Sequence, residues 1–328
     1  MSGRAPVSVI IPAYNGERFI AETIQSVLDQ TLPVSEIIVV DDGSSDNTAR
    51  VAESLGVTVV RQSNEGVSGS RNAGIRAATQ PWVSLIDQDD LWEQEKVELQ
   101  WKALQRYPEA GLTSCYMTWF EDPSIKGTTL LTDTDSLDGF SWKQTHEVDW
   151  KKPEAANFTY FPRVAYEPLL NRMWDKPSNF MVRRDLVLSI GGFDERLRQN
   201  EDLDCFLRLI ARCPFVIVER PLVRRRIHAQ NNSNYSHAAM SFLQIVEQMV
   251  TEPEKYPAGA ASAYRKEAWR VMIQVGRLRL LEGHTREARA LFAGSLKKLY
   301  SHRALLLWSL SFLSPATYKR VVRRAGWG

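Results

Sequence analysis

Short apolar runs rich in β-branched residues alternate with amphipathic stretches over the first third of the chain, and this alternation constrains the fold most strongly. The runs have the length of buried strands and lie at residues 7–11, 37–40, 57–60, 82–86 and 112–119. The stretches between them repeat apolar residues with a helical period, as Phe19, Ile24 and Val27 do. Strands alternating with helices predict an α/β fold with a parallel sheet covered by helices on both faces.

The pattern weakens in the middle of the chain and then returns. Residues 120–177 are rich in aromatic side chains but show little periodicity, which is typical of a lid or binding loop. Beyond it we expect strands at Asn179–Val182, Phe215–Val218 and Leu222–Arg226, and helices from Asp185 and over Glu201–Arg212. From residue 236 to 328 the pattern is helical, with a hairpin of Arg270–Leu281 and Arg286–Tyr300.

The composition is that of a soluble globular protein with one large or two ordinary domains: 328 residues, 44% apolar and 24% charged. The net charge of +2 does not by itself indicate a nucleic-acid partner. Basic residues concentrate after Glu287, beyond which no acidic residue follows, so the chain ends in a basic tail. The three cysteines form no CxxC pair, which favours buried free thiols in a reducing compartment.

Neither a membrane span nor a signal peptide is expected. The most apolar late stretch, Ala304–Leu313, has 10 residues, whereas a transmembrane helix needs about 20. The N-terminus runs into a predicted strand by Val7, which leaves no room for a secretory signal.

Three acidic clusters follow predicted strands or open a predicted helix: Asp41-Asp42, Asp87-Gln88-Asp89-Asp90 and Glu201-Asp202. In an open α/β sheet, ligands bind beyond the carboxyl ends of the strands. Carboxylates gathered there repel one another unless a cation or a hydrogen-bonded ligand offsets their charge. A divalent metal with a phosphorylated ligand is therefore the first hypothesis.

The two common phosphate-binding loops are absent. A dinucleotide fold places GxGxxG after its first strand, but the residues here are Pro12-Ala13-Tyr14-Asn15-Gly16-Glu17. The glycine-rich stretch at 66–74 has a different spacing, and no Walker sequence is present. Hard oxygen ligands such as Asp87 and Asp89 suit Mg²⁺ or Mn²⁺, which would offset a diphosphate instead.

Each cluster also has a purely structural interpretation. One aspartate of 87–90 could cap a helix starting near Glu93. After Asp41-Asp42, Ser44 or Ser45 could cap the next helix, and this is compatible with Asp41 or Asp42 binding a nucleobase or ribose. Acidic residues at 201–202 are favoured by the helix dipole; the functional alternative is a general base. His228 is either a surface histidine or, beside Arg224–Arg226, part of a site for phosphate or metal.

Seven motifs together resemble family 2 glycosyltransferases with the GT-A fold, over residues 6–235. They are SVIIPAYNG, VDDGSSDNT, NEGVSGSRNAG, LIDQDDLW, GGFDE, NEDLDCFLRL and RRRIHAQNNS, in that order. The resemblance implies a Rossmann-like, mixed, mostly parallel sheet with flanking helices over 1–235, in which 120–177 is an acceptor-side insert. Residues 236–328 would form a C-terminal α-helical extension.

The resemblance also implies roles for particular residues. Asp202 would be the catalytic base, with Glu201 positioning sugar or acceptor. Asp89 would be the first metal ligand, with His228 completing the site and Asp90 as a substitute. Asp42 would face the base of the nucleotide, supported by Asp41. The other residues expected around the nucleotide-sugar are Pro12, Ala13, Tyr14, Asn15, Glu17, Arg71, Asn72, Asp87 and Gln88.

The activity implied is inverting transfer of a sugar from a nucleotide-diphosphate sugar, most often a UDP-sugar, with Mg²⁺ or Mn²⁺, to a saccharide or lipid-linked acceptor. Two alternatives are a catalytically silent nucleotide-sugar-binding protein and a sugar nucleotidyltransferase. A nucleotidyltransferase usually needs a glycine-rich phosphate loop, which Pro12–Glu17 does not supply. A cytoplasmic location is expected. The basic C-terminal helices are either a subdomain packed on the catalytic core or a contact with the cytoplasmic face of the inner membrane.

Overall fold

The computed structural model describes residues 3–122, 157–162, 176–228, 235–298, 308–309 and 311. Most of segment 120–177 and nearly all of the tail after residue 298 lie outside these residues. The described residues form two compact units. Unit 1 contains those up to residue 228 together with Glu254–Ala258, and unit 2 contains 235–253 and those from 259 onward. The sequence places the division at 235 and does not anticipate that Glu254–Ala258 returns to unit 1.

The first half of the sheet in unit 1 is parallel. Strand β1 (Ala5–Ala13) lies between β2 (Val34–Asp41) and β4 (Trp82–Leu85), and β3 (Thr58–Arg61) pairs with β2. Because these strands are parallel, their carboxyl ends meet at one edge of the sheet. The chain places β2 and β3 on one side of β1 and β4 on the other, and a ligand site is expected where the order changes in this way.

The second half of the sheet is mixed. Strand β8 (Met181–Arg183) is antiparallel to both of its neighbours, β4 and β6 (Leu112–Glu121), whereas β6 and β9 (Phe215–Ile227) are parallel. The short strands β5 (Leu91–Trp92) and β7 (Phe158–Phe161) are antiparallel to β9. Most paired residues belong to parallel neighbours, which confirms the predicted mixed, mostly parallel sheet.

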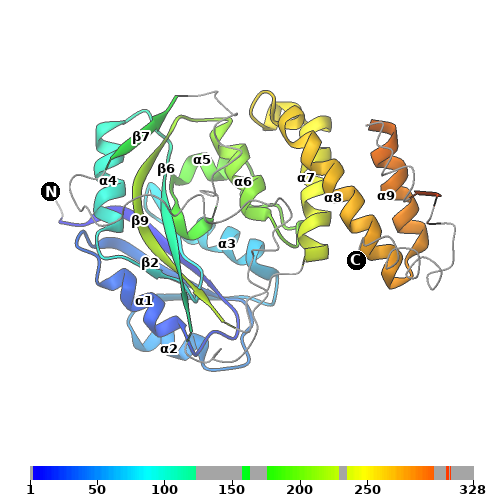
Figure 1. Ribbon diagram of the computed structural model, residues 1–328. Helices are drawn as coiled ribbons and strands as arrows, with labels where there is room; N and C mark the ends of the chain where they lie inside the picture. Colours follow the sequence, from blue (N-terminus) through cyan, green and yellow to red (C-terminus); the bar gives the residue numbers. More distant parts are fainter. Residues whose placement is uncertain are drawn as a thin grey trace. The chain divides into compact units, whose positions relative to one another are not determined.

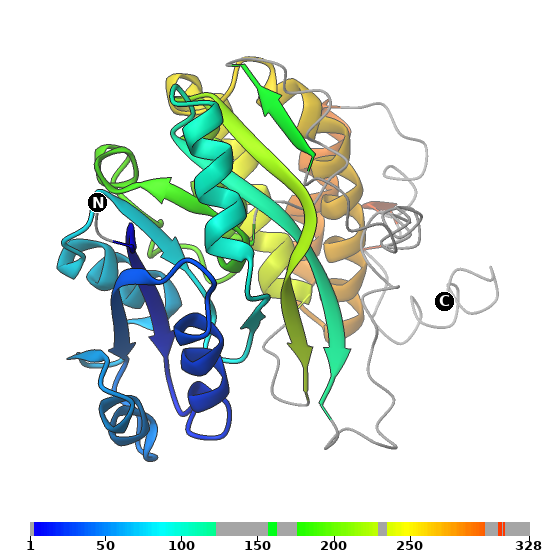
Figure 2. The same cartoon turned by 90° about the vertical axis from the view of Figure 1, so that its left-hand side faces the viewer.

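Helices cover both faces of this sheet (Figures 1 and 2). Val9 and Ile11 of β1 belong to a buried cluster with residues of α1 (Ile20–Leu28) and α4 (Lys96–Arg106). Ile10, which points to the opposite face as strand geometry requires, approaches α3 (Gly66–Ala77), where a Cβ on Gly74 would lie 2.3 Å from its Cγ2. The remaining regular elements are α2 (Thr48–Ser54), α5 (Arg184–Ser189), α6 (Glu201–Ile210) and the 3-10 turn η5 (Pro177–Asn179).

Unit 2 is helical, as the sequence predicts. Its helices are α7 (Tyr235–Thr251), α8 (Ala260–Glu282) and α9 (Thr285–Lys298), and its core includes Ala239, Val271 and Val275. Gly276 allows α8 and α9 to approach closely, because a Cβ there would lie 2.6 Å from the Phe292 ring. None of the described helices is long and apolar enough to cross a membrane. The proposed membrane-contacting stretch around 305–312 falls almost entirely outside the described residues.

Two local predictions are wrong. Ser44 and Ser45 do not cap α2, which begins at Thr48, and the Asp46 carboxylate accepts the N–H of Thr48 instead. The two strands expected at 215–218 and 222–226 are one strand, β9. Pro221 interrupts the sequence pattern but not the strand, because the register with β6 shifts beside its partner Tyr116.

Candidate functional site

The loop after β1 is joined to the loop after β4 by the side-chain amide of Gln88. Tyr14 N donates to Gln88 Oε1 at 2.9 Å, and Gln88 Nε2 donates to Tyr14 O at 3.1 Å. Gly16 leaves room for this amide, since a Cβ there would lie 2.1 Å from Oε1. Strand β1 ends with Pro12 and Ala13. Tyr14, the next residue, is 47% exposed. Tyr14 is thus accessible at the expected ligand edge.

Asn15 and Glu17 attach the same loop to the loop after β2. Asn15 has a left-handed φ of 48°, which asparagine tolerates better than most residues. Its N–H donates to Ser44 Oγ and its Oδ1 accepts the N–H of Ser45, each at 2.9 Å. Glu17 Oε2 accepts the N–H of Asn47 at 2.8 Å. Both side chains, expected around the nucleotide, therefore fix the backbone of the two loops.

The adjacent aspartates at the end of β2 have different surroundings. Both are buried, but they differ in hydrogen bonding: the Asp42 carboxylate accepts the N–H groups of Glu65 and Gly66 at 2.9 Å each and Gln62 Nε2 at 2.7 Å. Glu65 and Gly66 begin α3, where a negative charge is favoured by the helix dipole. Asp41 accepts one longer hydrogen bond, 3.3 Å from a backbone N–H of its own loop. Asp41 thus has more unused acceptor capacity than Asp42.

Arg71 of α3 joins two of the acidic clusters. It donates from Nη1 to Glu201 Oε1 at 2.6 Å and from Nη2 to Asp87 Oδ1 at 2.8 Å. Its guanidinium also lies over the Phe193 ring, 5.2 Å from the centroid. Burial alone would lower the pKa of Arg71, but Asp87 and Glu201 outweigh burial and raise it. One fixed, buried cation therefore brings the loop after β4 and the start of α6 together.

Asn72 contacts the turn between α5 and α6. Its Nδ2 donates to Phe193 O at 2.9 Å and to Glu195 Oε1 at 2.8 Å, and its Oδ1 accepts the N–H of Phe193 at 2.8 Å. Gly192 in that turn has a φ of +73°, and a Cβ on it would lie 2.3 Å from Asn72 Oδ1. Asn72, expected near the nucleotide or the sugar, therefore holds the turn that leads towards α6.

Asp89 and His228 approach each other from the loop after β4 and the end of β9. Asp89 Oδ2 and His228 Nε2 are 2.7 Å apart. The imidazole is 7% exposed and packs against the Phe19 ring at a centroid distance of 4.7 Å. The structure thus brings together two residues that are 139 positions apart in the sequence and that were both predicted to bind metal.

Asp90 is held inside the fold. One carboxylate oxygen accepts Ser178 Oγ at 2.6 Å, and the other accepts the N–H of Arg226 at 3.4 Å. Burial, followed by the negative charges of Asp87 and Asp89, raises the pKa of Asp90 well above its usual range. These contacts give Asp90 a structural role and leave Asp89 as the better candidate for a metal ligand.

Glu201 and Asp202 begin α6 and are both buried. Burial raises the pKa of Glu201, and the Arg71 charge opposes this only in part. Asp202 Oδ2 accepts Lys176 Nζ at 2.6 Å, and Oδ1 accepts the N–H of Leu203 at 2.8 Å. Burial also acts to raise the pKa of Asp202, but Lys176 and these hydrogen bonds outweigh it and lower the pKa. Asp202 is therefore ionised at neutral pH, as a general base must be.

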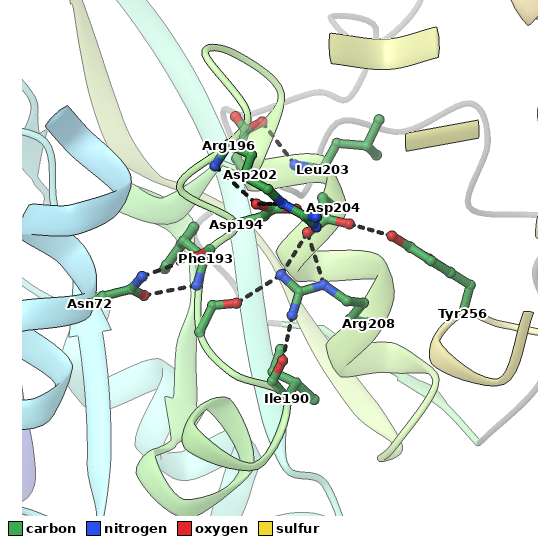
Figure 3. A network of polar contacts seen from close by, with 11 residues as sticks. Asn72, Ile190, Phe193, Asp194, Arg196, Asp202, Leu203, Asp204, Arg208 and Tyr256 are labelled. Atoms are coloured by element: carbon green, nitrogen blue, oxygen red, sulfur yellow. Dashed lines mark hydrogen bonds and ion pairs between the residues drawn. The ribbon is translucent and has the colours of Figure 1, made fainter. Parts of the chain in front are cut away.

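A buried polar network fixes α6 (Figure 3). Arg208 forms an ion pair with Asp204 and also donates to the carbonyl groups of Ile190 and Gly192 at 2.8 and 2.7 Å. The hydroxyl of Tyr256, on the stretch that returns to unit 1, donates to Asp204 Oδ1 at 2.6 Å. Because these groups are buried, their hydrogen bonds give α6 and the preceding turn one defined arrangement.

Two residues of the site, Lys176 and Ser178, were missed by sequence reasoning, whereas Arg226 belongs to the basic run beside His228 for which a phosphate or metal site was considered. Lys176 contacts Asp202, Ser178 contacts Asp90, and Arg226 Nε donates to Asp89 O at 3.2 Å. Lys176 and Ser178 flank Pro177 at the end of the aperiodic segment, where no periodic signal exists. Polar residues that immediately precede a predicted buried strand were the available clue.

The donor set near Asp89 fits a divalent metal held partly by a substrate. No group of three or more His, Cys, Asp or Glu side chains arranged around one point occurs among the described residues. Asp89 and His228 nevertheless present a carboxylate oxygen and an imidazole nitrogen 2.7 Å apart. Ions bound by one or two protein ligands usually complete their coordination with phosphate oxygens and water. The carboxylate oxygen suits both Mg²⁺ and Mn²⁺.

Comparison with known proteins identifies the family and the fold of the chain. The family described as Glycosyl transferase family 2 matches residues 8–187, and Glycosyltransferase like family 2 matches residues 156–270. An uncharacterized glycosyltransferase of Rickettsia prowazekii (strain Madrid E) is 27% identical over 230 residues, which cover 70% of this chain and 66% of that protein. The chain thus spans about two thirds of the length of that relative.

Two solved structures have the same fold. TarS 1–349 of S. aureus, crystallised with UDP-GlcNAc, has a TM-score of 0.58 and 16% identity over 96% of this chain and 92% of TarS 1–349. The mannosyltransferase PcManGT of Pyrobaculum calidifontis, in complex with GDP-Man and Mn²⁺, has a TM-score of 0.51 and 18% identity over 99% of this chain and 85% of PcManGT. With a family match over more than half of its length, the chain belongs to glycosyl transferase family 2 and has the GT-A fold.

Proposed function

We propose that this chain is an inverting glycosyltransferase, with a nucleotide-diphosphate sugar as donor and a hydroxyl of a saccharide or lipid-linked glycan as acceptor. The Arg71 contacts carry this proposal. They join Asp87, beside the candidate metal ligand Asp89, to Glu201, beside the candidate base Asp202. A transferase needs both a site for the leaving diphosphate and a base for the attacking hydroxyl, and these contacts hold the two within one site.

Asp202 is the proposed general base. The acceptor hydroxyl gives its proton to the Asp202 carboxylate while its oxygen forms a bond to the anomeric carbon of the donor sugar. The bond from that carbon to the diphosphate breaks on the opposite side, and the electron pair leaves with the diphosphate, so the configuration inverts. Base assistance of this kind is worth about 10²–10⁴ in rate.

Asp89 and His228 are the residues that would hold a divalent metal, Mg²⁺ or Mn²⁺. A bound metal supplies Lewis-acid stabilisation of the departing diphosphate. Two proteins of the same fold support the donor class, because TarS was crystallised with UDP-GlcNAc and PcManGT has a structure in complex with GDP-Man and Mn²⁺. A UDP-sugar remains the first donor to test, and the sugar itself is not assigned.

Recognition of the nucleobase is better assigned to Asp41 than to Asp42, which the sequence favoured. The Asp42 carboxylate already accepts three hydrogen bonds, whereas that of Asp41 accepts one of 3.3 Å. The exposed side chain of Tyr14 is a second candidate contact. These assignments, like the cytoplasmic location and the inner-membrane contact, remain proposals.

Release of nucleotide from a panel of UDP-, GDP- and dTDP-sugars tests the function directly. We expect release from one donor with Mn²⁺ or Mg²⁺ present and its loss on addition of EDTA. Asp202→Asn should lose about 10²–10⁴ in turnover while donor affinity by calorimetry is kept. The exposed Asp185, paired with Arg183, supplies the matched control Asp185→Asn, which should change neither.

Donor binding without any turnover would favour the catalytically silent nucleotide-sugar-binding protein, and absence of both binding and turnover with metal present would contradict the transferase proposal. A fully active Asp202→Asn variant would falsify the base assignment but not the transferase proposal.

A further inference from the structure

The carboxylate of Asp202 has both oxygens occupied by protein donors. Lys176 Nζ lies 2.6 Å from Oδ2, and the N–H of Leu203 lies 2.8 Å from Oδ1. The Asp202 side chain is 11% exposed and that of Lys176 is 25% exposed. Leu203 donates through the backbone of α6, so that contact is fixed by the helix. The only one of these two donors that can leave without unwinding α6 is therefore the Lys176 ammonium.

We infer that Lys176 is a positioning residue that occupies the base before the acceptor arrives. Its ammonium rests on Asp202 Oδ2, the oxygen that receives the acceptor's proton, and the acceptor hydroxyl enters by taking its place. The inference rests on the proposed function, because it assumes that Asp202 is the base. It accounts for a lysine that directly faces a buried carboxylate beside the proposed reaction centre.

The backbone around Lys176 is tied to the loop after β4. Lys176 immediately precedes the 3-10 turn η5, and its carbonyl accepts the N–H of Asn179 at 2.9 Å. In the same turn, Ser178 Oγ accepts the N–H of Asp87 at 3.1 Å and donates to Asp90 at 2.6 Å. One short turn thus connects the loop that carries Asp87 to the cation on Asp202. The ammonium can move on its flexible stem while its anchor point stays fixed.

Charged groups from three elements face Asp202. Lys176 precedes η5, Arg71 comes from α3, and Glu201 lies beside Asp202 in α6, with the buried thiol of Cys205 one turn further. Arg71 is already shared between Asp87 and Glu201, so Lys176 is the cation in direct contact with Asp202. Without Lys176, burial would dominate and favour the protonated, inactive form of Asp202.

The test replaces Lys176 and follows the pH dependence of transfer. In Lys176→Met, the acid limb of kcat/KM should move upward by about 1–3 pH units, the usual effect of one close opposite charge. Lys176→Arg keeps the positive charge and should leave the limb in place. Lys102→Met removes an exposed lysine that pairs with Glu98 on α4, and it should match the wild type throughout. Thermal melts of each variant establish that it is folded.

A second readout does not depend on turnover. The pKa of Asp202 can be followed by ¹³C NMR of labelled aspartate carboxyls, with Asp202→Asn to assign the signal. A higher Asp202 pKa in Lys176→Met, restored in Lys176→Arg, supports the inference about Lys176. If the same pKa shift is found but no donor is turned over, the result counts against the proposed function and not against the contact of Lys176 with Asp202. An unmoved limb and an unmoved pKa overturn the inference, as does an equal loss of activity at every pH in folded Lys176→Met. That last result would mean a merely structural lysine.

Discussion

The loops after β2 and β4 both carry aspartates near their start, yet the two sets of carboxylates have different partners. After β2, Asp42 accepts two backbone N–H groups at the start of α3, and Asp46 accepts the N–H of Thr48 at the start of α2. After β4, Asp87 contacts the Arg71 side chain of α3, 16 positions earlier, and Asp89 contacts the His228 side chain, 139 positions later. The first loop uses its charge to shape backbone, and the second presents its charge to side chains.

The difference separates structural from exchangeable anions. A carboxylate bound to backbone N–H groups at a helix start is replaced only at the expense of that helix. A carboxylate bound to a side-chain cation or imidazole can exchange that partner for a metal or a ligand group. Acidic residues at strand ends predict a site in both cases, but a carboxylate of the first kind, such as that of Asp42, is committed to the fold, whereas one of the second kind can bind a metal or a ligand.

Of the substitutions that test this difference, Arg71→Met should have the largest effect on stability and activity. It removes the cation shared by Asp87 and the buried Glu201, and loss of one member of a buried ion pair costs about 3–5 kcal/mol. We expect a loss of that size in the free energy of unfolding by urea, together with loss of transfer activity. Arg71→Lys should rescue little, since one ammonium cannot reach two carboxylates as a guanidinium does.

The matched control for Arg71 is a surface pair of the same chemistry. Arg183 and Asp185 are 53% and 65% exposed. Arg183→Met should therefore change the free energy of unfolding by at most about 1 kcal/mol. Equal losses in the two variants would contradict a special role for the buried pairs.

Asp42→Asn and Asp41→Asn should differ in kind. Asp42→Asn weakens charge-assisted bonds to the start of α3, so the free energy of unfolding should fall by about 1.5–3 kcal/mol. Asp41→Asn alters one long bond and should cost less stability, but it should weaken donor binding more. Urea unfolding gives the free energy of unfolding, and calorimetry at a temperature where both variants are folded gives the donor affinity. The reverse order of donor affinities would return base recognition to Asp42.

These contrasts explain how far the sequence could be read. The positions of the strands and the acidic clusters were predictable, because alternation and local composition express them directly. The partner of each carboxylate was not. Nothing near Asp42 in the sequence indicates that its partners are the N–H groups of Glu65 and Gly66, and the contact of Asp89 with His228 spans 139 positions. Local patterns cannot distinguish a capping anion from an exchangeable one.

Lys176 and Tyr256 show the same limit from another side. Lys176 lies beside an aperiodic segment, and Tyr256 lies between two helices of unit 2 although its stretch belongs to unit 1. Lys176 contacts α6 at Asp202, and Tyr256 contacts it at Asp204. Isolated polar residues outside periodic elements leave no signal in hydrophobic periodicity, so the side chains that they contact are known only from the three-dimensional structure.

Lys96 sharpens the comparison, because it is a buried cation with no ion-pair partner among the described residues. Its Nζ lies 2.8 Å from Gln100 Oε1 and 3.7 Å from the centroid of the Trp92 ring. Burial lowers the pKa of Lys96 to about 8. Above that pH the native state loses a proton that the unfolded state keeps up to about 10.4, so stability rises with pH between these values. The gain from pH 7.5 to 9.5 should be about 2 kcal/mol.

Cys115 must be removed to observe this effect cleanly. Burial raises the pKa of its thiol to about 11, so the unfolded state ionises first and stability falls with pH above about 9, opposite in sign to the Lys96 effect. Urea unfolding at the two pH values should therefore compare Cys115→Ala with the double variant Cys115→Ala, Lys96→Met. Between these pH values stability should rise by about 2 kcal/mol more in the first than in the second, because other groups, including the buried thiol of Cys205, titrate equally in both. Equal slopes would show that Lys96 is not the group that titrates.

The smallest effect should come from the contact between Gln88 in the loop after β4 and the Tyr14 backbone in the loop after β1. Gln88→Ala removes two hydrogen bonds to the Tyr14 backbone, worth about 0.5–1.5 kcal/mol each, and much of this is offset by water because the site is exposed. Gly16→Ala should displace the same amide, since its Cβ would lie 2.1 Å from Oε1. Each variant should raise the KM for the donor a few-fold.

A double-mutant cycle decides whether these two substitutions act through one contact. If the amide of Gln88 is what Gly16 accommodates, the double variant should raise the donor KM no more than either single one. Additive effects would instead mean that Gly16→Ala perturbs the backbone of the β1 loop by itself. The Gln88 side chain is a neutral amide that bonds to the backbone of the other loop, so it is neither a structural nor an exchangeable anion. If both single variants raise the donor KM and the double variant raises it no further, the β4 loop must be held against the β1 loop for a nucleotide-sugar to bind. The negative charge of the β4 loop would then not be sufficient.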